Sequence, residues 1–402
     1  MSTLKVNSIS DAAGANGNAI TLATDGTCTA KITNNLSNRN LIINGAMQVA
    51  QRSTSSTTIG YGSVDRYKAE GSNTGQTATY SQQSLSSSDT GPWEKGFRKY
   101  MRLALASAGT ANVNAWTSIQ QRVEAQNVAN SGWDYTSASS DITLSFWFRA
   151  STNQTFYSYI YSYDGTAQGY AFSFTASGNN TWTKVTHTIP GNSNITVDND
   201  NGAGLQINFL PFLGTDKTNN KTLNTWAAHD SSNYVPDMAS TWLTTGTPTF
   251  DITGVQLEVG SATDFEFKSY SDELLRCMRY CIVDSASTSG AAWHLFTEGY
   301  LPYATSAYIN YRPYVPMRTV PSVVEAGIDD GGTSSSGNGM YIQTGTASGI
   351  EILAISAASV NAASNERTCL MVVTCASGTA GSPCTMNSWN NQTSYLQLEA
   401  EL

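Results

Sequence analysis

The stretch Ile142-Thr143-Leu144-Ser145-Phe146-Trp147-Phe148 decides the fold. Its even positions are all large and apolar, and Thr143 and Ser145 stand between them. Because successive side chains of a strand point to opposite faces, this pattern predicts a strand whose even positions lie in a hydrophobic core. A helix would instead repeat its apolar positions at intervals of three and four residues.

Outward from this stretch, short strand-like runs recur at intervals of about 10–20 residues, and clusters of Gly, Ser, Asn and Asp separate them. The clearest runs are 100–105, 142–149, 155–163, 171–174, 182–189, 205–209 and 250–259. No long helical period interrupts them, so residues 40–268 are expected to form a jelly-roll β-sandwich. In the last run, alternation predicts that Asp251, Val255 and Leu257 share one face and that Glu258 lies on the other.

Three further regions flank the sandwich. Residues 1–39 carry too little apolar mass for a core, so we expect them to be disordered or to form an extended attachment or stalk segment that is ordered by pairing with other chains. Residues 269–283 are expected to form a short linking helix, with Ser271 as its cap and an apolar stripe at Leu274, Cys277, Met278 and Cys281. Residues 284–402 are again rich in strand-formers and predict a C-terminal β-sandwich domain. The chain as a whole is therefore expected to be all-β.

Charge and hydropathy exclude several functions. Only 13% of the 402 residues are charged, and the formal net charge is −9. A nucleic-acid site needs clustered Lys and Arg, so no nucleic-acid partner is expected. No run approaches the ~20 apolar residues that span a bilayer, so membrane insertion is not expected either. The first 31 residues lack the apolar core of a signal peptide, which leaves lysis or particle assembly as the expected route out of the cell.

Several motifs resemble a family of phage tail-fibre and related virion proteins that carry a carbohydrate-module-like jelly roll. The motifs lie at 40–52 (NLIINGAMQVAQR), 64–67 (VDRY), 144–150 (LSFWFRA), 182–185 (WTKV), 252–260 (ITGVQLEVG), 263–266 (TDFE) and 273–280 (ELLRCMRY). The opening TLKVNSI at 3–9 is similar to attachment segments of marine phage fibres, and EAEL at 399–402 to a common fibre C-terminus. The sequence departs from the family at Tyr67, where Trp is usual, at Asp264 (Pro) and at Met278 (Gln). Judged by these motifs, the resemblance extends over roughly two thirds of the chain.

The resemblance implies a tail-fibre subunit of a virion, assembled in the host cytoplasm, without enzymatic activity, that helps to recognise a host-surface glycan. It also implies a homotrimer whose N-terminal segment binds other tail proteins. Two alternatives stay open. A capsid decoration, head-fibre or baseplate subunit would use the sandwich for packing, and a tail-associated depolymerase would cleave the polysaccharide.

A row of tyrosines is the first candidate glycan site. Tyr157, Tyr159, Tyr161 and Tyr163 recur with a period of two and so stand on one face of a strand. Aromatic rings offer an apolar face to the C–H surface of a sugar, and their hydroxyls can bond its rim. The alternative is that the rings pack within the protein or against a neighbouring subunit.

Tryptophans in Ser-, Thr-, Asn- and Gly-rich contexts are the second candidate: Trp116, Trp133, Trp226 and Trp242, with Trp93 in a similar setting. Loops at the ends of a sandwich often carry recognition, but a loop tryptophan can equally be buried beneath its own loop.

No catalytic residue, metal ligand or cofactor is assigned. Cys277 and Cys281 provide only two of the four ligands of a structural zinc. Residues 198–202 (DNDNG) favour a polar turn over a calcium loop. Asp264 and Glu266 stand ~7 Å apart on one face of an extended segment, which suits a pair of hydrolytic carboxylates, but they lie in a structural motif of the family.

Overall fold

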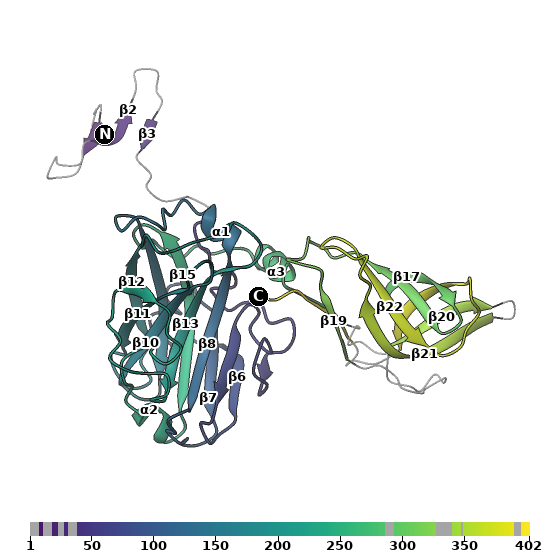
Figure 1. Cartoon of the computed structure of the whole chain (residues 1–402), viewed down its shortest axis with the longest axis horizontal. Coiled ribbons are helices and arrows are strands. Elements are labelled where there is room, and N and C mark those ends of the chain that lie inside the picture. Colours follow the sequence, from purple (N-terminus) through teal and green to yellow (C-terminus); the bar gives the residue numbers. More distant parts are fainter. Residues whose placement is uncertain are drawn as a thin grey trace.

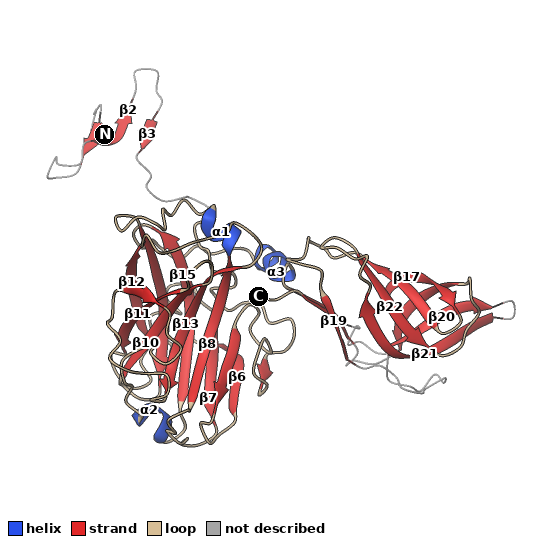
Figure 2. Ribbon diagram, in the orientation of Figure 1, coloured by secondary structure: helices blue, strands red, loops and turns tan. Residues whose placement is uncertain are grey.

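The computed structural model describes residues 8–10, 18–22, 28–30, 38–285, 293–326, 340–346, 349–389 and 395–402. Strands dominate these residues, and the helices in them are short (Figure 2). The all-β prediction is confirmed. A β-sandwich and a smaller strand domain lie side by side, and the last residue stands between them near α3 (Tyr270–Met278) (Figure 1).

The sandwich consists of two antiparallel six-stranded sheets. The front sheet comprises, in spatial order, β14 (Trp226–Ala228), β11 (Gln168–Thr175), β10 (Thr155–Ser162), β13 (Ala203–Leu213), β8 (Trp116–Glu124) and β5 (Lys68–Ser72). The back sheet comprises β12 (Thr183–Pro190), β9 (Asp141–Ala150), β15 (Thr249–Val259), β7 (Lys99–Leu105), β6 (Ala78–Ser84) and β4 (Ser55–Ser56). Neighbours in the sheets are often distant in sequence, as in a jelly roll.

The hydrophobic core lies between these sheets and contains the even positions of β9, as predicted. Leu144, Phe146 and Phe148 are fully buried. The ring of Phe146 lies edge-on to Phe174 and Phe209 of the front sheet, with centroids 5.2 and 4.9 Å apart. Such edge-to-face contacts are a preferred aromatic geometry, so β9 holds the two sheets together.

The face assignment for β15 is wrong because the strand contains a β-bulge. The register with β9 shifts between Thr253 and Gln256, and Gly254 takes a positive φ of 62°. One extra residue reverses the alternation, so Phe250 and Ile252 point inward before the bulge and Val255 and Leu257 after it. Asp251 and Glu258 therefore share the outer face of the back sheet.

The helices are α1 (Ala125–Ala129), α2 (Thr241–Thr244) and α3. The linking helix α3 is shorter than the predicted 269–283. Its cap is Ser269, which accepts a hydrogen bond from the amide of Asp272 at 3.1 Å, and not Ser271. The chain leaves the helix after Met278, so Cys281 opens strand β16 (Cys281–Ser285) and is no part of the apolar stripe.

The C-terminal domain is a closed barrel and not the predicted sandwich. Its strands, in order around the barrel, are β17 (Trp293–Tyr303), β18 (Ser306–Tyr311), β22 (Cys369–Cys375), β21 (Gly349–Val360), β20 (Met340–Thr346) and β23 (Pro383–Trp389). Strand β23 pairs with both β17 and β20, which closes the sheet on itself. Strand residues alternate between core and surface in a barrel and in a sandwich alike, so the sequence pattern alone could not distinguish the two architectures.

A small sheet of β16, β24 (Tyr395–Glu399) and β19 (Ser322–Ala326) connects the barrel to the sandwich. Residues after β24 return to the sandwich. Glu401 forms ion pairs with Arg66 and, at 3.2 Å, with Arg52. The guanidinium of Arg66 lies 3.4 Å from the ring centroid of Tyr280, so the junction is a buried, charge-paired contact.

At the other end of the chain, β1 (Ser8–Ser10), β2 (Asn18–Leu22) and β3 (Cys28–Ala30) form an antiparallel sheet of their own. The predicted extended segment is 1–39, and the rest of its residues up to 37 lie outside the described residues. Asn38 begins the described connection to the sandwich, where its amide bonds the carboxylate of Glu266 at 2.6 Å.

Candidate functional site

The outer face of the front sheet carries a row of polar and aromatic side chains. On β8 and β13 the apolar residues Ile119, Leu205 and Ile207 fill the core. The positions between them must then point outward. The outward side chains that gather on this face are Glu70, Trp116, Ser118, Gln120, Arg122, Gln206 and Asn208.

The predicted tyrosines also lie on this outer face, because their neighbours Phe156 and Ile160 point into the core. They divide into two pairs. Tyr157 and Tyr159 are buried, at 8% and 0% exposure, beneath another part of the chain. Tyr161 and Tyr163 are half-buried, and their rings meet edge-on with centroids 4.5 Å apart. Only this second pair has surface to offer a ligand.

The segment 214–240 covers Tyr157 and Tyr159 and forms one wall of the site. Val235 of this segment is fully buried against the sheet. The ring of Tyr234 lies 4.9 Å from that of Tyr159, and Nδ1 of His229 lies 2.8 Å from the Tyr159 hydroxyl. The burial of Tyr157 and Tyr159 is therefore the internal packing that the sequence left as an alternative.

Two adjoining hollows, of about 110 and 230 Å³, run along this face and form one groove. They share Glu70, Gln120, Gln206, Asn208 and Tyr234 as lining. Trp116 and Lys217 line the smaller hollow; Arg122, Tyr161, Tyr163 and His229 line the larger one. Trp116 and Arg122 lie six residues apart on β8, which sets the length of the groove at roughly 20 Å.

A hydrogen-bonded chain fixes the floor of the groove. Nε of Arg122 bonds Oε1 of Gln206 at 2.8 Å, and the Tyr163 hydroxyl donates to the same oxygen. Nε2 of Gln206 donates to Oδ1 of Asn208 at 2.6 Å, and Nδ2 of Asn208 to the Tyr159 carbonyl at 2.8 Å. These side chains are held in place before any ligand arrives.

Gln120 differs from its neighbours. Its Nε2 donates to Oε2 of Glu70 at 2.9 Å, but its Oε1 has no hydrogen-bond partner among the described residues. The residue is only 3% exposed and lines both hollows. A buried acceptor without a partner costs about 1–3 kcal/mol, so a donor from a ligand or water is expected there.

Burial favours the uncharged forms of Tyr159, Tyr163 and His229 in the groove. It raises the pKa of Tyr163 to about 12 and that of Tyr159 further. Burial also lowers the pKa of His229, and nearby Lys221 lowers it too. Hydroxyls and a neutral imidazole are thus presented, groups that can both donate and accept hydrogen bonds.

The predicted tryptophans are not brought together. Trp116 lines the groove, but Trp133, Trp226 and Trp242 are 3%, 7% and 0% exposed and pack in the sandwich core. The structure corrects the assignment of these three as ligand-facing. Their indole N–H groups bond backbone carbonyls of Ser140, Pro190 and Thr249 at 3.0, 2.7 and 2.8 Å, which closes the ends of the sandwich.

Sequence reasoning missed Gln120, Arg122, Gln206 and Asn208. A signal was present, because Gln206 and Asn208 alternate with Leu205, Ile207 and Phe209. What it could not supply was the pairing of β13 with β8 and β10, which brings these side chains beside the tyrosines.

Of the two carboxylates weighed as a catalytic pair, Asp264 is exposed and Glu266 binds the backbone. Glu266 accepts hydrogen bonds from the amides of Asn38 and Asn40 at 2.6 and 2.9 Å. Burial alone would raise its pKa, but bonding to Lys268 and these amides lowers it, so it is held ionised. In the described part of the chain no group of three His, Cys, Asp or Glu side chains is placed to hold a metal ion. Nor does any described helix have the length and apolar character that crossing a bilayer requires.

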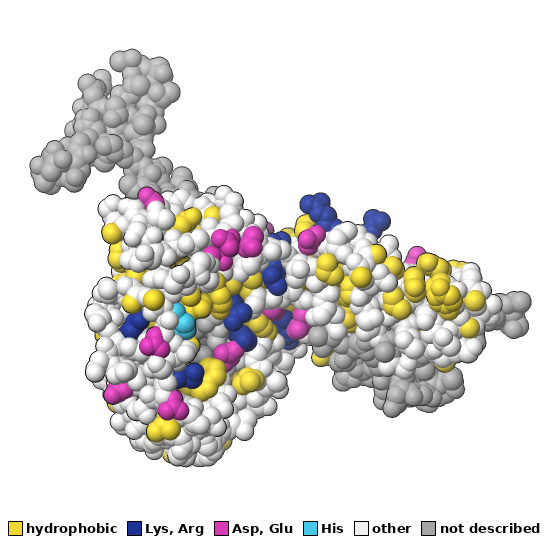
Figure 3. Space-filling model, in the orientation of Figure 1, with side chains coloured by type: hydrophobic (Ala, Val, Ile, Leu, Met, Phe, Trp, Pro, Cys, Tyr) yellow, Lys and Arg dark blue, Asp and Glu magenta, His cyan; other side chains and the backbone are white. Residues whose placement is uncertain are grey.

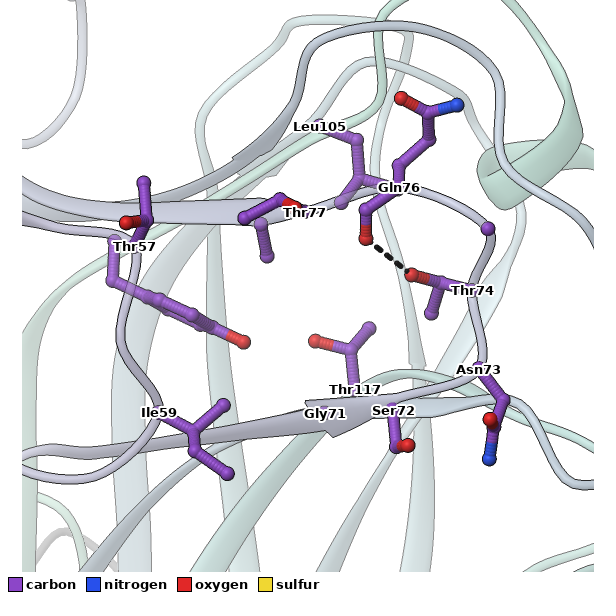
Figure 4. Close-up of a pocket in the computed structure, with 13 residues that line it drawn as sticks. Thr57, Ile59, Gly71, Ser72, Asn73, Thr74, Gln76, Thr77, Leu105 and Thr117 are labelled. Atoms are coloured by element: carbon purple, nitrogen blue, oxygen red, sulfur yellow. Dashed lines mark hydrogen bonds between the residues drawn. The ribbon is translucent and has the colours of Figure 1, made fainter.

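A separate hollow of about 170 Å³ is lined by residues of β5, the edge strand of the front sheet, and of β6 in the back sheet (Figure 4). Its lining is mostly Thr, Ser, Gly and Asn, and the Thr74 hydroxyl donates to the carbonyl of Gln76 at 2.9 Å across its rim. The described residues that line it include no carboxylate, basic group or thiol. It therefore offers fewer means of recognition than the groove.

The fold and the groove define a class: a β-sandwich protein with an aromatic- and amide-lined groove on one sheet. No family model and no curated protein matches the sequence. Similar solved structures include the enzymatically active domain of bacteriophage CBA120 tailspike protein 4, at 13% identity and TM-score 0.30, over 55% of this chain and 22% of that one. They also include a family 61 carbohydrate-binding module in complex with β-1,4-galactotriose, at 11% identity and TM-score 0.28, over 56% of this chain and 99% of the module.

A third similar structure is the N-terminal cellulose-binding domain of Cellulomonas fimi β-1,4-glucanase C, at 13% identity and TM-score 0.26, over 54% of this chain and all of that domain. The chain spans less than a quarter of the tailspike domain. With TM-scores this low, the fold assignment rests on the strand pairing described above.

Proposed function

We propose that this chain is a non-enzymatic subunit of a bacteriophage tail fibre and that it recognises a host-surface glycan through the groove on the front sheet. The observation that carries the proposal is the groove itself. It combines Trp116 and Tyr161 with a pre-ordered row of amides and with Oε1 of Gln120, which has no hydrogen-bond partner among the described residues.

This combination suits an oligosaccharide. A sugar ring has an apolar C–H face that packs on aromatic rings and a rim of hydroxyls that both donate and accept hydrogen bonds. A hydroxyl donor would satisfy Oε1 of Gln120. A groove of roughly 20 Å accommodates several units of an extended chain more readily than a single small ligand.

The proposal includes no enzymatic role because of the number of carboxylates that line the groove. Glycoside hydrolysis usually needs two carboxyl groups about 5–9.5 Å apart. Among the described residues, Glu70 is the one carboxylate that lines the two hollows, and it forms an ion pair with Lys68. A lone, charge-paired carboxylate lacks the partner that the reaction requires.

The proposed place of this chain in the virion is based on the motifs that resemble fibre proteins and on the first 39 residues, which carry too little apolar mass for a core. We propose that these residues associate in a homotrimer and contact other tail proteins. Three chains would present three grooves, and weak single contacts would gain from avidity.

A glycan array tests the groove. We expect Tyr161→Ala and Trp116→Ala each to weaken binding by about tenfold, which is about 1.4 kcal/mol. Tyr303→Ala is the matched control, because Tyr303 is 64% exposed but lies on the barrel. If Tyr161→Ala and Trp116→Ala bind the glycan as tightly as the Tyr303→Ala control does, the groove is not the binding site.

Location and activity need separate measurements. Reconstruction of the virion should place the chain in the tail fibre; density in a capsid decoration, head fibre or baseplate would select that alternative. Chain-length analysis of a bound polysaccharide after incubation should show no change. Short oligosaccharide products would identify a depolymerase.

A further inference from the structure

Basic side chains from different elements converge on the groove. The guanidinium of Arg122 lies 5.3 Å from the ring centroid of Tyr163. Nζ of Lys217 lies 5.4 Å from the ring centroid of Trp116 and 5.6 Å from that of Tyr234. Over the middle of the sandwich, Figure 3 shows Lys and Arg side chains next to hydrophobic ones. The aromatic lining of the groove is therefore bordered by cations at both ends.

A third cation, Lys221, belongs to the segment 214–240 that forms one wall of the groove. Lys221 is only 9% exposed, and its Nζ lies 5.8 Å from the ring centroid of Tyr159. Burial lowers the pKa of Lys221, although the neighbouring Asp230 opposes this effect. A buried ammonium without an ion pair is unfavourable, and a nearby anion would relieve that cost.

Among the described residues that line the two hollows, Glu70 is the only acidic one. Glu70 is already paired with Lys68, and Asp230 is exposed and accepts hydrogen bonds from the amide and hydroxyl of Ser232. Among the described residues, Arg122, Lys217 and Lys221 form no ion pair. The lining of the groove, with Arg122 and Lys217 against Glu70, is thus locally positive although the chain carries a net charge of −9.

From this arrangement we infer that the ligand of the groove is an acidic polysaccharide, whose carboxylates meet Arg122 at one end and Lys217 at the other. The inference rests on the proposed glycan-binding function and adds the charge of the ligand. Arg122 presents a planar fork that can bond a carboxylate with two N–H groups. Lys217 is half-buried and contributes a point charge above Trp116. Lys217 lies over Trp116, and Arg122 stands six residues further along β8, or roughly 20 Å of strand, so the two cations contact different units of one extended chain.

The amide side chains between the two cations would then form hydrogen bonds with the neutral part of the ligand. Gln120 and Asn208 lie between Trp116 and Arg122 in the lining, where sugar hydroxyls would meet them. The binding energy is divided between these hydrogen bonds and the terminal charges. Only the charge contribution should weaken with salt, since exposed charges are screened over about 8 Å at physiological ionic strength.

The test compares each acidic polysaccharide with its own neutral form. The probes are alginate, polygalacturonate and acidic bacterial capsular polysaccharides, each in native and carboxyl-reduced form, at low and high salt. The proteins are the full chain, Arg122→Gln, Lys217→Gln, the conservative Lys217→Arg, and Lys184→Gln. Lys184 is an exposed lysine on the back sheet and serves as the matched control.

We expect at least one native polysaccharide to bind about tenfold more tightly than its reduced form. That preference should shrink in Arg122→Gln and Lys217→Gln and at high salt, and should persist in Lys217→Arg and Lys184→Gln. Equal binding of native and reduced forms would overturn the acidic-ligand inference and leave the proposed function standing. A preference that both Gln variants retain would overturn the assignment to these residues. Binding of neither form of any probe would count against the proposed function itself.

Discussion

Gly169 on β11 gives the sharpest test of how the tyrosine row is packed. It pairs with Tyr161 in the sheet, and the side chain of Tyr159 from the neighbouring strand lies across it. A Cβ at Gly169 would stand 1.7 Å from the Tyr159 hydroxyl oxygen and 2.3 Å from its Cζ. Tyr159 is fully buried, so its ring has no free space into which it could move.

The cost of Gly169→Ala follows from these contacts. Overpacking a filled interior costs about 1–3 kcal/mol. Displacing the ring also breaks the 2.8 Å bond between the Tyr159 hydroxyl and His229, a further loss of about 0.5–1.5 kcal/mol. We therefore expect the sandwich to lose about 2–4 kcal/mol of stability.

Urea unfolding followed by tryptophan fluorescence measures this loss, because seven of the nine tryptophans precede residue 269. The midpoint should fall while the slope stays constant. Gly345→Ala on β20 is the matched control, since a Cβ there meets nothing within 4 Å. In a Tyr159→Leu background the atoms that clash are absent, so Gly169→Ala should cost much less. An unchanged midpoint, or an equal cost in both backgrounds, would refute the packing of Tyr159 against Gly169.

Three other predictions concern stability and protonation. Phe146→Ala should destabilise the sandwich by about 3–5 kcal/mol in the same urea assay, because it removes the ring that touches both sheets; a loss below 1 kcal/mol would contradict its place in the core. Burial alone would raise the pKa of Glu124, but bonds from Arg279 and Tyr280 lower it below the ordinary 4.5. Its contribution to stability should therefore be complete above pH 4.5 and fall as the solution becomes more acidic, a dependence that Glu124→Gln should reduce when unfolding is followed against pH. The lowered pKa of His229 means that the folded state binds fewer protons, so stability should decline as pH falls through 6.5, and NMR titration of the imidazole should give a pKa below that value.

The strand pattern predicted the sandwich well because the apolar residues that recur with a period of two are also the residues that the core buries. Leu144, Phe146 and Phe148 occupy the core as expected, and the tyrosines of β10 share the opposite face. Alternation fails where the backbone adds a residue. The bulge at Gly254 reverses the faces of Val255 and Leu257. The glycine is the one local feature of the sequence that indicates this bulge.

The candidate site was only partly predictable, because it depends on contacts between distant segments. The polar row on β8 and β13 joins the tyrosines through strand pairing, which one sequence does not encode in any local pattern. The burial of Tyr159 depends on the segment 214–240 folding over it. Likewise, a tryptophan in a polar loop context such as Trp242 can pack inward, and composition does not distinguish that outcome from exposure.

The most direct test of the central claim is oxidative footprinting of the intact chain with and without a polysaccharide that binds it. The account predicts that ligand protects Trp116, Tyr161 and Tyr163 from oxidation, while Tyr300 and Tyr303 on the barrel remain as reactive as before. Protection confined to the barrel tyrosines, with no change at the front sheet, would contradict it.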